Sequence, residues 1–208
     1  MQLKADHVSF RYNQADQWIL KDVSLEFHEG ERVGIVGPSG YGKSTLSKIL
    51  AGYENPSEGR VLLDEAPLPM KGFCPVQMIY QHPELSVNPR WKMKKTLTEC
   101  WEPPQELLDR IGIETAWFTR WPAELSGGEL QRFCIARVLS PETKFLICDE
   151  ITTMLDVITQ AQIWQTLTGI AQERNMGMIV ITHNMALAEK VCTRIVDLRT
   201  VNHIEPSE

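Results

Sequence analysis

The chain has 208 residues, a length that suits one domain or one domain with a modest insertion. Its apolar content of 43% and charged content of 23% are ordinary for a globular protein, and its net charge of −6 argues against a generally basic nucleic-acid-binding protein. Because no apolar run reaches about 18 residues and no secretory signal is visible, we expect a soluble intracellular protein.

Predicted strands and helices alternate along most of the chain. The expected strands are at residues 3–12, 20–27, 32–36, 61–63, 78–80, 145–148, 178–182 and 194–198. The expected long or capped helices are at residues 43–51, 157–174 and 186–191. This order is typical of an α/β fold whose sheet is largely parallel and which begins with antiparallel strands. We expect the last ten residues, which are mostly polar, to be loose.

Residues 82–135 differ in composition from the segments on either side. They contain several prolines, a helical pattern at residues 105–111, and four of the six tryptophans, namely Trp91, Trp101, Trp117 and Trp121. We therefore predict a mainly helical insertion in a single domain that covers residues 1–208. The core of this domain is expected in residues 1–81 and 136–208.

A glycine-rich loop lies between the strand predicted at 32–36 and the helix that follows it. Its sequence, GPSGYGKST, matches the phosphate-binding pattern GxxxxGK[ST] of a P-loop NTPase core. Glycines let backbone N–H groups turn toward phosphate oxygens, and the helix N-terminus adds partial positive charge. The alternative is a plain glycine turn before a helix, but the strand before it and the helix after it favour a nucleotide site. The predicted ligand-binding residues are Gly37, Ser39, Gly40, Tyr41, Gly42, Lys43, Ser44 and Thr45.

The chemistry of such a loop assigns roles to particular side chains. We expect Lys43 to reach the β- and γ-phosphates and the Ser44 hydroxyl to bind Mg²⁺. A second magnesium carboxylate is needed at the end of a neighbouring strand, and FLICDE ends in Asp149 and Glu150. Asp149 is predicted to join the metal shell, and Glu150 to polarise or deprotonate an attacking water. An apolar strand that ends in a solvated acidic turn is the alternative, and the phosphate-binding loop argues against it.

A third segment, LSGGELQR, begins another helix. Ser126 is a natural N-cap, and Gly127 and Gly128 leave the first helical N–H groups accessible to an anion. Starting a helix is the alternative role. Because one phosphate loop already serves one nucleotide, we predict that this second helix end serves a nucleotide bound by another copy of the fold.

The three segments together resemble the nucleotide-binding subunit of an ATP-binding-cassette (ABC) transporter, from Leu3 to about Leu198 and in the family's motif order. The resemblance implies an ATPase with ATP and Mg²⁺ as cofactors. It implies that Tyr12 stacks on adenine, that Gln81 touches Mg²⁺ and the attacking water, and that His183 contacts the γ-phosphate. It also implies a dimer contact at Asp156. Residues of the signature segment that would cover the partner's ATP are Ser126, Gly127, Gly128 and Glu129.

Two further stretches, QHPELSVNPR at 81–90 and DVITQAQI at 156–163, resemble the ATPases of peptide and nickel importers. This resemblance implies import of peptides, nickel or metal–chelator complexes. The metal would be cargo, because the five cysteines and five histidines show no metal-site spacing. The chain departs from the family pattern at Ile151, where proline is usual, at Met154, where a small residue is common, and at His82, where Asp is frequent. It also stops soon after Leu198, without the extension common in that subfamily.

The resemblance also implies partners and a place in the cell. It predicts membrane permease subunits, a second ABC ATPase chain in head-to-tail contact, an external solute-binding protein in the complex, and no nucleic acid. The expected location is the cytoplasmic face of the cell membrane, as a peripheral protein. The alternative is a non-transport ABC ATPase that acts as a regulatory or nucleic-acid-associated module. For the four tryptophans, we weigh packing of the insertion against a groove, formed with Gln81 and the loop after it, for a permease helix.

Overall fold

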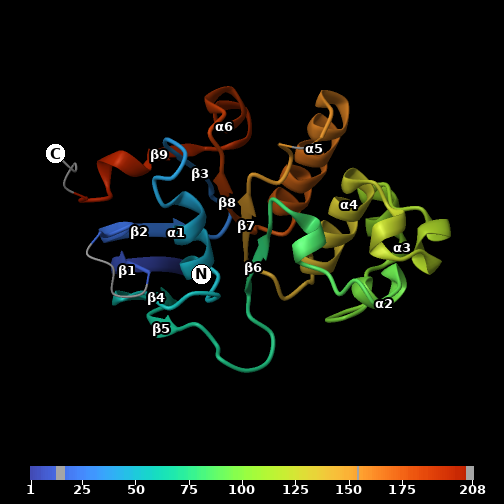
Figure 1. The fold of residues 1–208 in the computed structure, drawn as a ribbon, viewed down its shortest axis with the longest axis horizontal. Helices are drawn as coiled ribbons and strands as arrows, with labels where there is room; N and C mark the ends of the chain where they lie inside the picture. The colour runs from blue at the N-terminus through green and yellow to red at the C-terminus, as the bar shows by residue number, and fades with distance from the viewer. Residues whose placement is uncertain (13–16, 154, 205–208) are drawn as a thin grey trace.

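Two sheets and the helices around them form the protein in the computed structural model, which describes residues 1–12, 17–153 and 155–204 (Figure 1). The first sheet is antiparallel, in the order β2-β1-β4-β5, and the second is parallel, in the order β6-β7-β8-β3-β9. The strands are β1 Gln2–Phe10, β2 Leu20–His28, β3 Arg32–Val36, β4 Glu58–Leu63, β5 Ala66–Pro67, β6 Val76–Ile79, β7 Phe145–Asp149, β8 Gly177–Ile181 and β9 Arg194–Asp197. The predicted α/β class, with a parallel sheet and N-terminal antiparallel strands, is confirmed.

The helices cover the parallel sheet on both faces. The α-helices are α1 Lys43–Leu50, α2 Met93–Leu97, α3 Gln105–Ile111, α4 Gly127–Val138, α5 Val157–Glu173 and α6 Met185–Val191. Short 3₁₀ turns are η1 Pro83–Leu85, η2 Thr115–Thr119, η3 Pro122–Glu124 and η4 Leu198–Thr200. No helix within the described ranges has the length and apolar character needed to cross a bilayer.

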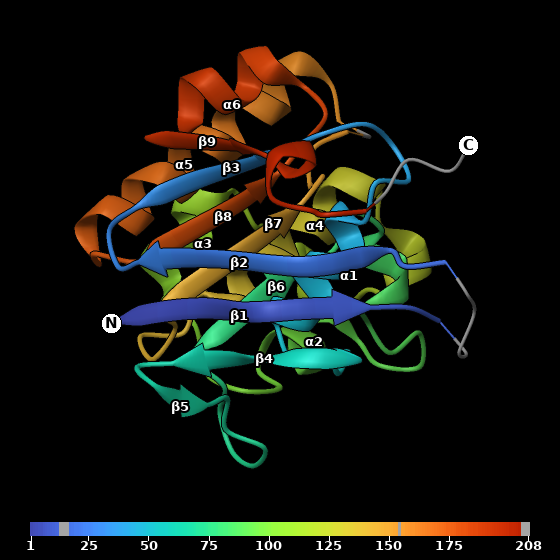
Figure 2. The same cartoon turned by 90° about the vertical axis from the view of Figure 1, so that its left-hand side faces the viewer.

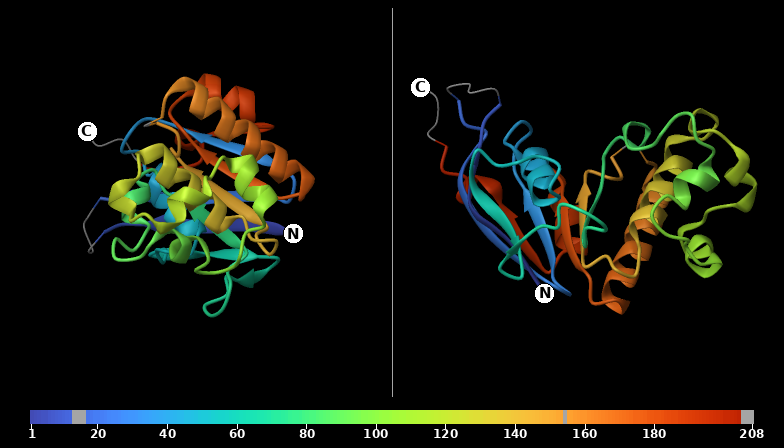
Figure 3. Two further views of the ribbon diagram at one scale, coloured as in Figure 1. Left: turned by 90° about the vertical axis from the view of Figure 1, so that its right-hand side faces the viewer. Right: turned by 90° about the horizontal axis from the view of Figure 1, so that it is seen from below.

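The parallel sheet separates two hydrophobic clusters. The view from below shows the antiparallel sheet and α1 on one side of it and α4 and α5 on the other (Figure 3). One cluster joins the antiparallel sheet and α1 to one face of the parallel sheet, through residues such as Phe27, Leu46 and Phe145. The other joins α4, α5 and the helical segments after Gln81 to the opposite face, through residues such as Phe133 and Leu167. After the half-buried Arg32, every residue of β3 is buried, and so is every residue of β8. Burial on both faces explains why these strands are apolar runs instead of alternating ones.

The helices α2 and α3 and the first turns of α4 gather at one side of the molecule, beyond β6 and α5 (Figure 1). This is the region in which the sequence predicts a helical insertion. The predicted end of that insertion, residue 135, lies inside α4.

The prediction that the last ten residues are loose is wrong for residues 199–204. The Asn202 side chain is 3% exposed, and it accepts the Lys21 N–H at 2.8 Å and donates to the Ile19 carbonyl at 3.1 Å. The His203 N–H donates to the Lys21 carbonyl at 3.0 Å. Polar residues here satisfy the backbone at the start of β2, so their polarity does not indicate mobility. Figure 2 shows the segment after β9 passing near this end of β2. Residues 205–208 lie outside the described residues.

Candidate nucleotide-binding site

The phosphate loop (residues 37–45) leads from the end of β3 into α1. β3 lies between β8 and β9, so the loop stands at the carboxyl edge of the parallel sheet, where ligands bind in open α/β folds. Gly42 caps α1 with φ 92° and no side-chain hydrogen bond, which leaves the first helical N–H groups without a side-chain acceptor. A Cβ at Gly42 would lie 2.9 Å from the Ile19 carbonyl, so the β1–β2 hairpin rests directly on this loop.

Lys43 is held over the loop by backbone carbonyls. Its side chain is 6% exposed, and its Nζ donates to the carbonyls of Gly37 and Pro38, each at 2.8 Å. The loop sequence contains no other cation. The ammonium therefore lies inside the curve of the loop, within reach of a phosphate bound there.

Ser44 and Asp149 meet beside Lys43, although 105 positions separate them in the chain. The Ser44 Oγ donates to Asp149 Oδ1 at 3.2 Å, and the Ser47 Oγ donates to Oδ2 at 3.4 Å. Burial raises the pKa of Asp149, whose side chain lies at the end of β7 and is 5% exposed. A cation would relieve this desolvation, and a hydroxyl with a carboxylate is a donor set that suits Mg²⁺, which keeps water and phosphate oxygens as its other ligands.

Ser47 was not predicted from the sequence. It lies one turn after Ser44 on α1, and its hydroxyl steadies the second oxygen of the carboxylate. The spacing of three residues on one helix face is the signal that could have identified it.

Three predicted residues come together at the ends of adjacent strands. Glu150 follows β7, Gln81 follows β6 and His183 follows β8. The His183 Nδ1 lies 3.1 Å from Glu150 Oε1, and the Gln81 Nε2 donates to Glu150 Oε2 at 3.4 Å. Glu150 has φ 50°, a conformation that side-chain-bearing residues rarely adopt, and its N–H donates to the Ile181 carbonyl at 3.1 Å. The backbone strain thus aims this carboxylate at the gap between Gln81 and His183.

The loop after Glu150 is tied to α5. Ile151, at the position where ABC ATPases, which the sequence resembles, usually have proline, is 3% exposed in the core, and Thr152 is 2% exposed. The Thr152 Oγ1 accepts hydrogen bonds from Gln160 Nε2 at 2.8 Å and Trp164 Nε1 at 3.1 Å, two residues that the sequence did not indicate. These bonds fix the loop without a proline. Met154 lies outside the described residues.

Asp156 caps α5 in this structure. Its Oδ1 accepts the N–H groups of Ile158 and Thr159, and its Oδ2 accepts the Thr159 hydroxyl at 2.6 Å. These hydrogen bonds hold the pKa of Asp156 below its usual range. A local capping role therefore accompanies the predicted dimer contact.

The signature segment (residues 125–132) begins α4 with a capping box. The Ser126 Oγ accepts the Glu129 N–H at 3.3 Å, and the Glu129 carboxylate accepts the Ser126 N–H at 2.7 Å. That backbone bond holds the pKa of Glu129 below its usual range. Space is open around Gly127. α4 and α1 pack on opposite faces of the parallel sheet, so this helix end and the phosphate loop lie on different sides of one chain (Figures 1 and 3).

Tyr12 lies just beyond the end of β1 with its side chain 45% exposed, and its ring meets Phe10 edge-on at 4.8 Å. Trp18, which the sequence analysis did not single out, lies on the returning side of the same hairpin. Its ring faces the Arg11 guanidinium at 4.7 Å and the Lys21 ammonium at 4.1 Å. The hairpin end therefore presents one open aromatic ring and one ring held between cations.

A groove of about 490 Å³ opens beside the site. Its lining residues are Ser44, Lys48, Tyr53, Glu54, Tyr80, Gln81, His82, Leu85 and Asp149. Leu85 is 81% exposed and Tyr53 57% exposed, while burial raises the pKa of Tyr80 to about 12, so its phenol keeps its proton. The tryptophans at 91, 101, 117 and 121 are absent from this lining, so the prediction that one or two of them border a groove with Gln81 does not hold for this groove.

The four tryptophans instead serve several local roles. Trp117 is 8% exposed and packs near Phe133, and the Trp101 Nε1 donates to the Arg137 carbonyl at 2.9 Å. Trp91 lies under Lys95, and Trp121, which is 41% exposed, is near Lys92. Packing of the helical segment accounts for Trp117 and Trp101.

The sequence of the chain is similar to a known protein family and to characterised proteins. A family model described as ABC transporter matches residues 20–153. The chain is 35% identical over 211 residues to the nickel import system ATP-binding protein NikE of Staphylococcus aureus (strain bovine RF122 / ET3-1), across 95% of this chain and 86% of the relative.

Solved structures give the same picture. The dimeric post-hydrolysis state of the ATP-binding cassette MJ0796 bound to ADP and Pi is similar with a TM-score of 0.80 and 26% identity, over 94% of this chain and 93% of that one. The structure of cbiO1 from Clostridium perfringens, part of the ABC transporter complex cbiONQ, is similar with a TM-score of 0.74 and 25% identity, over 94% and 84% of the two chains. The similarity thus extends well beyond the phosphate loop.

Proposed function

The chain belongs to the ABC transporter family as an ATP-hydrolysing subunit, and we propose that it powers the import of nickel, metal–chelator complexes or peptides through a membrane permease. The observation that carries the ATPase chemistry is the convergence of Lys43, Ser44, Asp149 and Glu150 at one edge of the parallel sheet. The 35% sequence identity to a nickel import ATP-binding protein supports the proposed cargo class.

Phosphate binding falls to the backbone and to Lys43. The N–H groups of the phosphate loop and the N-terminus of α1 would bind the phosphates, and the Lys43 ammonium would give the β- and γ-phosphates a charge-assisted partner. Ser44 and Asp149 would hold Mg²⁺, with Gln81 beside them, and the ion supplies positive charge to the phosphate oxygens when bound. Tyr12 is proposed to stack on the adenine.

Water activation falls to Glu150. Its carboxylate has an oxygen directed to Gln81 and another directed to His183, so a water between these three groups would meet a general base, an amide and an imidazole. We propose that Gln81 orients this water and that His183 contacts the γ-phosphate. The strained backbone of Glu150 fixes the carboxylate before substrate binds.

The second anion-ready helix end implies a head-to-tail pair. Because α4 begins on the other side of the sheet from α1, Ser126, Gly127 and Gly128 of one chain are proposed to cover ATP held by the phosphate loop of a second, identical or related chain. Glu129 supports the cap, and Asp156 is proposed to touch the partner. We further propose residues 82–135 as the helical subdomain within a core of residues 1–81 and 136–208.

The groove beside Gln81 is proposed to receive a permease helix on the cytoplasmic face of the membrane. Leu85→Glu should lower recovery of the protein with membranes at least about tenfold, because it puts a charge on the most exposed apolar side chain of the groove. Trp121→Glu is the matched control, since Trp121 is exposed and apolar but lies outside the groove lining. Membrane flotation of tagged variants measures the effect; equal loss in both variants, or loss of ATP binding with Leu85→Glu, would contradict the assignment.

Cargo is tested by isolation and uptake. Tagged protein is purified from detergent-extracted membranes, its partner subunits are identified, and uptake of radioactive nickel, with and without chelator, and of labelled peptides is compared in cells with and without the chain. We expect recovery of permease subunits and loss of one of these uptake activities. A partner set made of nucleic-acid-processing proteins, with uptake unchanged, would overturn the transport proposal.

A further inference from the structure

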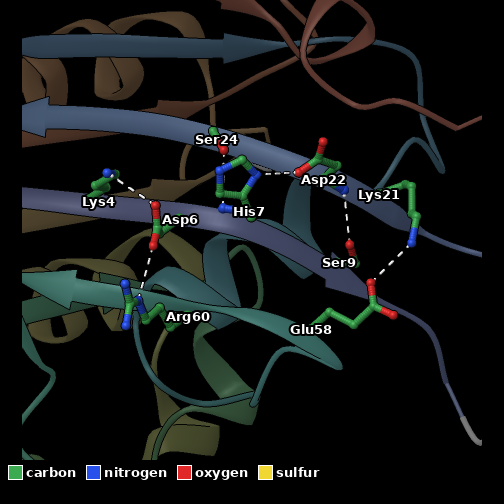
Figure 4. Close-up of polar contacts among 9 residues, drawn as sticks. All are labelled: Lys4, Asp6, His7, Ser9, Lys21, Asp22, Ser24, Glu58 and Arg60. Atoms are coloured by element: carbon green, nitrogen blue, oxygen red, sulfur yellow. Dashed lines mark hydrogen bonds and ion pairs between the residues drawn. The ribbon is translucent and has the colours of Figure 1, made fainter.

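Two short segments of identical pattern face each other in the N-terminal sheet. His7-Val8-Ser9 belongs to β1 and Asp22-Val23-Ser24 to β2, and the two valines are directly paired. Both valines are fully buried, while the residues before them point to the outer face of the sheet, where Figure 4 shows them side by side. The arrangement is nearly symmetric about the Val8–Val23 pair.

Each segment provides a serine hydroxyl that accepts the backbone N–H of the first residue of the other segment. His7 has φ 54° and Asp22 has φ 52°, a left-handed conformation that residues other than glycine rarely adopt. The His7 N–H donates to the Ser24 Oγ at 3.1 Å, and the Asp22 N–H donates to the Ser9 Oγ at 3.0 Å. The His7 Nδ1 lies 2.6 Å from Asp22 Oδ1, which joins the two turned residues across the strands (Figure 4).

The two turned residues are β-bulges that offset each other. Between the pairs Ala5–Leu25 and Val8–Val23, β1 has two residues where β2 has one. Between Val8–Val23 and Phe10–Leu20, β2 has two residues where β1 has one. A bulge in one strand alone would shift the pairing by one residue and turn the following side chains to the other face. Because the bulges are paired, Phe10 and Leu20 both stay buried beyond them.

The third strand is shaped to the same distortion. Gly59 of β4 lies beside His7 with φ 79°, and a Cβ there would overlap the His7 carbonyl. Any side chain at position 59 would therefore push β1 away. Three neighbouring strands thus bend at one level of the sheet.

The segment beyond the bulges is the one that meets the nucleotide site. The Ile19 N–H donates to the Phe10 carbonyl at 2.9 Å, and the Ile19 carbonyl lies against Gly42 of the phosphate loop. The Phe10 and Tyr12 rings pack edge-on, with their centroids 4.8 Å apart. The register set at His7 and Asp22 therefore determines where Tyr12 stands relative to the phosphate loop.

From this geometry we infer that His7 and Asp22 are positioning residues for the adenine of ATP: their paired bulges hold the hairpin so that Tyr12 can stack on the base. The inference rests on the proposed role of Tyr12. It predicts an effect on base recognition that leaves triphosphate recognition and chemistry alone. Although the hairpin touches Gly42, the side chains of Lys43, Ser44, Asp149 and Glu150 form their hydrogen bonds with residues outside the hairpin.

Asp22→Val tests the inference, because a β-branched residue does not adopt φ near 50°. Stacking of one base on an aromatic ring changes affinity by about 5- to 150-fold, so we expect a rise of about five- to tenfold in KM for MgATP with kcat unchanged. The inhibition constant of magnesium tripolyphosphate, which has no base, should not move. Asp22→Ala is a milder second variant and should shift KM in the same direction.

Three further measurements separate positioning from general damage. Asp22→Asn, unlike Asp22→Val, should keep the wild-type KM, since Asn tolerates the left-handed conformation and offers an acceptor to His7. Arg60→Ala, which removes only an exposed ion pair with Asp6, should change neither constant. In a Tyr12→Ala background, Asp22→Val should have no additional effect.

The opposite results are equally clear. Any of three results would overturn the positioning role while leaving ATP hydrolysis intact. The first is a parallel rise in KM and in the tripolyphosphate inhibition constant, and the second is an unchanged KM in both Asp22→Val and Asp22→Ala. The third is an effect of Asp22→Val that is undiminished in the Tyr12→Ala background. Failure of the wild-type chain to bind MgATP or tripolyphosphate would instead refute the proposed nucleotide chemistry, and this inference with it.

Discussion

Lys43→Ala is expected to reduce ATP affinity by about two to four orders of magnitude and to abolish measurable hydrolysis. Lys43 is the one cation of the phosphate loop, and its Nζ already sits 2.8 Å from two loop carbonyls, at the centre of the curl. Two charge-assisted contacts to phosphate, each worth about 1.5–3 kcal/mol, account for a loss of this size.

The fold should survive this substitution. Lys43 makes no ion pair with a carboxylate among the described residues: its ammonium donates to the carbonyls of Gly37 and Pro38. The core contacts of the same helix come from Leu46, Ile49 and Leu50, which the substitution leaves in place. Lys144→Ala is the matched control, because Lys144 is a partly exposed lysine just before β7. It therefore lies at the amino-terminal ends of the parallel strands, away from the phosphate loop at their carboxyl ends. Equilibrium binding of a fluorescent ATP analogue, with circular dichroism of each variant, measures the result; wild-type affinity in a folded Lys43→Ala protein would refute the assignment of this loop.

Local sequence patterns were sufficient for most of the fold. Buried parallel strands such as β3 and β7 are continuous apolar runs, and the helix at Gln105–Ile111 follows a clear 3.6-residue period, so their positions are set by short-range information. The 3₁₀ turns η1 to η4 and the short helix α2 were not predicted. Each is too short to show a period. The placement of η1 and α2 depends on packing against α4, whereas η4 packs through Leu198 into the cluster on the other face of the sheet.

Part of the site was predictable from the residues alone. Asp149 and Glu150 end an apolar strand, and the phosphate loop requires a carboxylate at the end of a neighbouring strand. Gln81 and His183 were identified through the resemblance to the ABC family, and they lie beside Glu150 because each follows a parallel strand of the same sheet. Contacts made by hydroxyl groups were less predictable. Ser47 could have been identified from its three-residue spacing after Ser44, but the bond between Thr152 and Trp164 depends on which face of α5 turns toward the loop, which the pattern of polar residues does not specify.

The N-terminal sheet and the C-terminal segment show what side-chain-to-backbone bonds conceal from sequence reasoning. His7 and Asp22 occupy left-handed positions that no glycine marks, and the repeated Val-Ser pair is the only local sign of them. Asn202 is polar and buried at once, because its amide replaces a strand partner for β2. Polarity does not mark these positions: His7 and Asp22 are polar and exposed but have a left-handed backbone, whereas Asn202 is polar and buried.

Glu150→Gln is expected to lower the rate of ATP hydrolysis by about a hundredfold or more while leaving MgATP binding intact. Glutamine keeps the size of the side chain and one acceptor oxygen for Gln81 or His183. Its NH2 group replaces the second oxygen, and it cannot accept a proton from water, a role worth about 10²–10⁴ in rate. Glu142→Gln, at an exposed turn before β7, is the control and should hydrolyse ATP at the wild-type rate.

The same variant should accumulate as an ATP-dependent dimer, with itself or with a cognate cassette chain. Bound ATP joins the phosphate loop of one chain to the α4 N-terminus of the other, and a slow enzyme does not remove the γ-phosphate that stabilises this contact. Adding Ser126→Arg should prevent the dimer, because it removes the N-cap and places a positive charge at the positive end of α4. MgATP affinity of the monomer should remain, since α1 and α4 lie on opposite faces of the sheet.

Size-exclusion chromatography with light scattering, with and without MgATP, distinguishes these outcomes, and thermal unfolding shows whether Ser126→Arg has damaged the helix instead of the interface. A loss of one N-cap costs about 0.5–2 kcal/mol, so the double variant should unfold somewhat earlier yet remain folded at room temperature. Normal turnover in Glu150→Gln would mean that another group activates the water. Absence of any ATP response in self- or partner-pairing would refute the head-to-tail arrangement, because the phosphate loop and the signature helix end would then have no nucleotide in common.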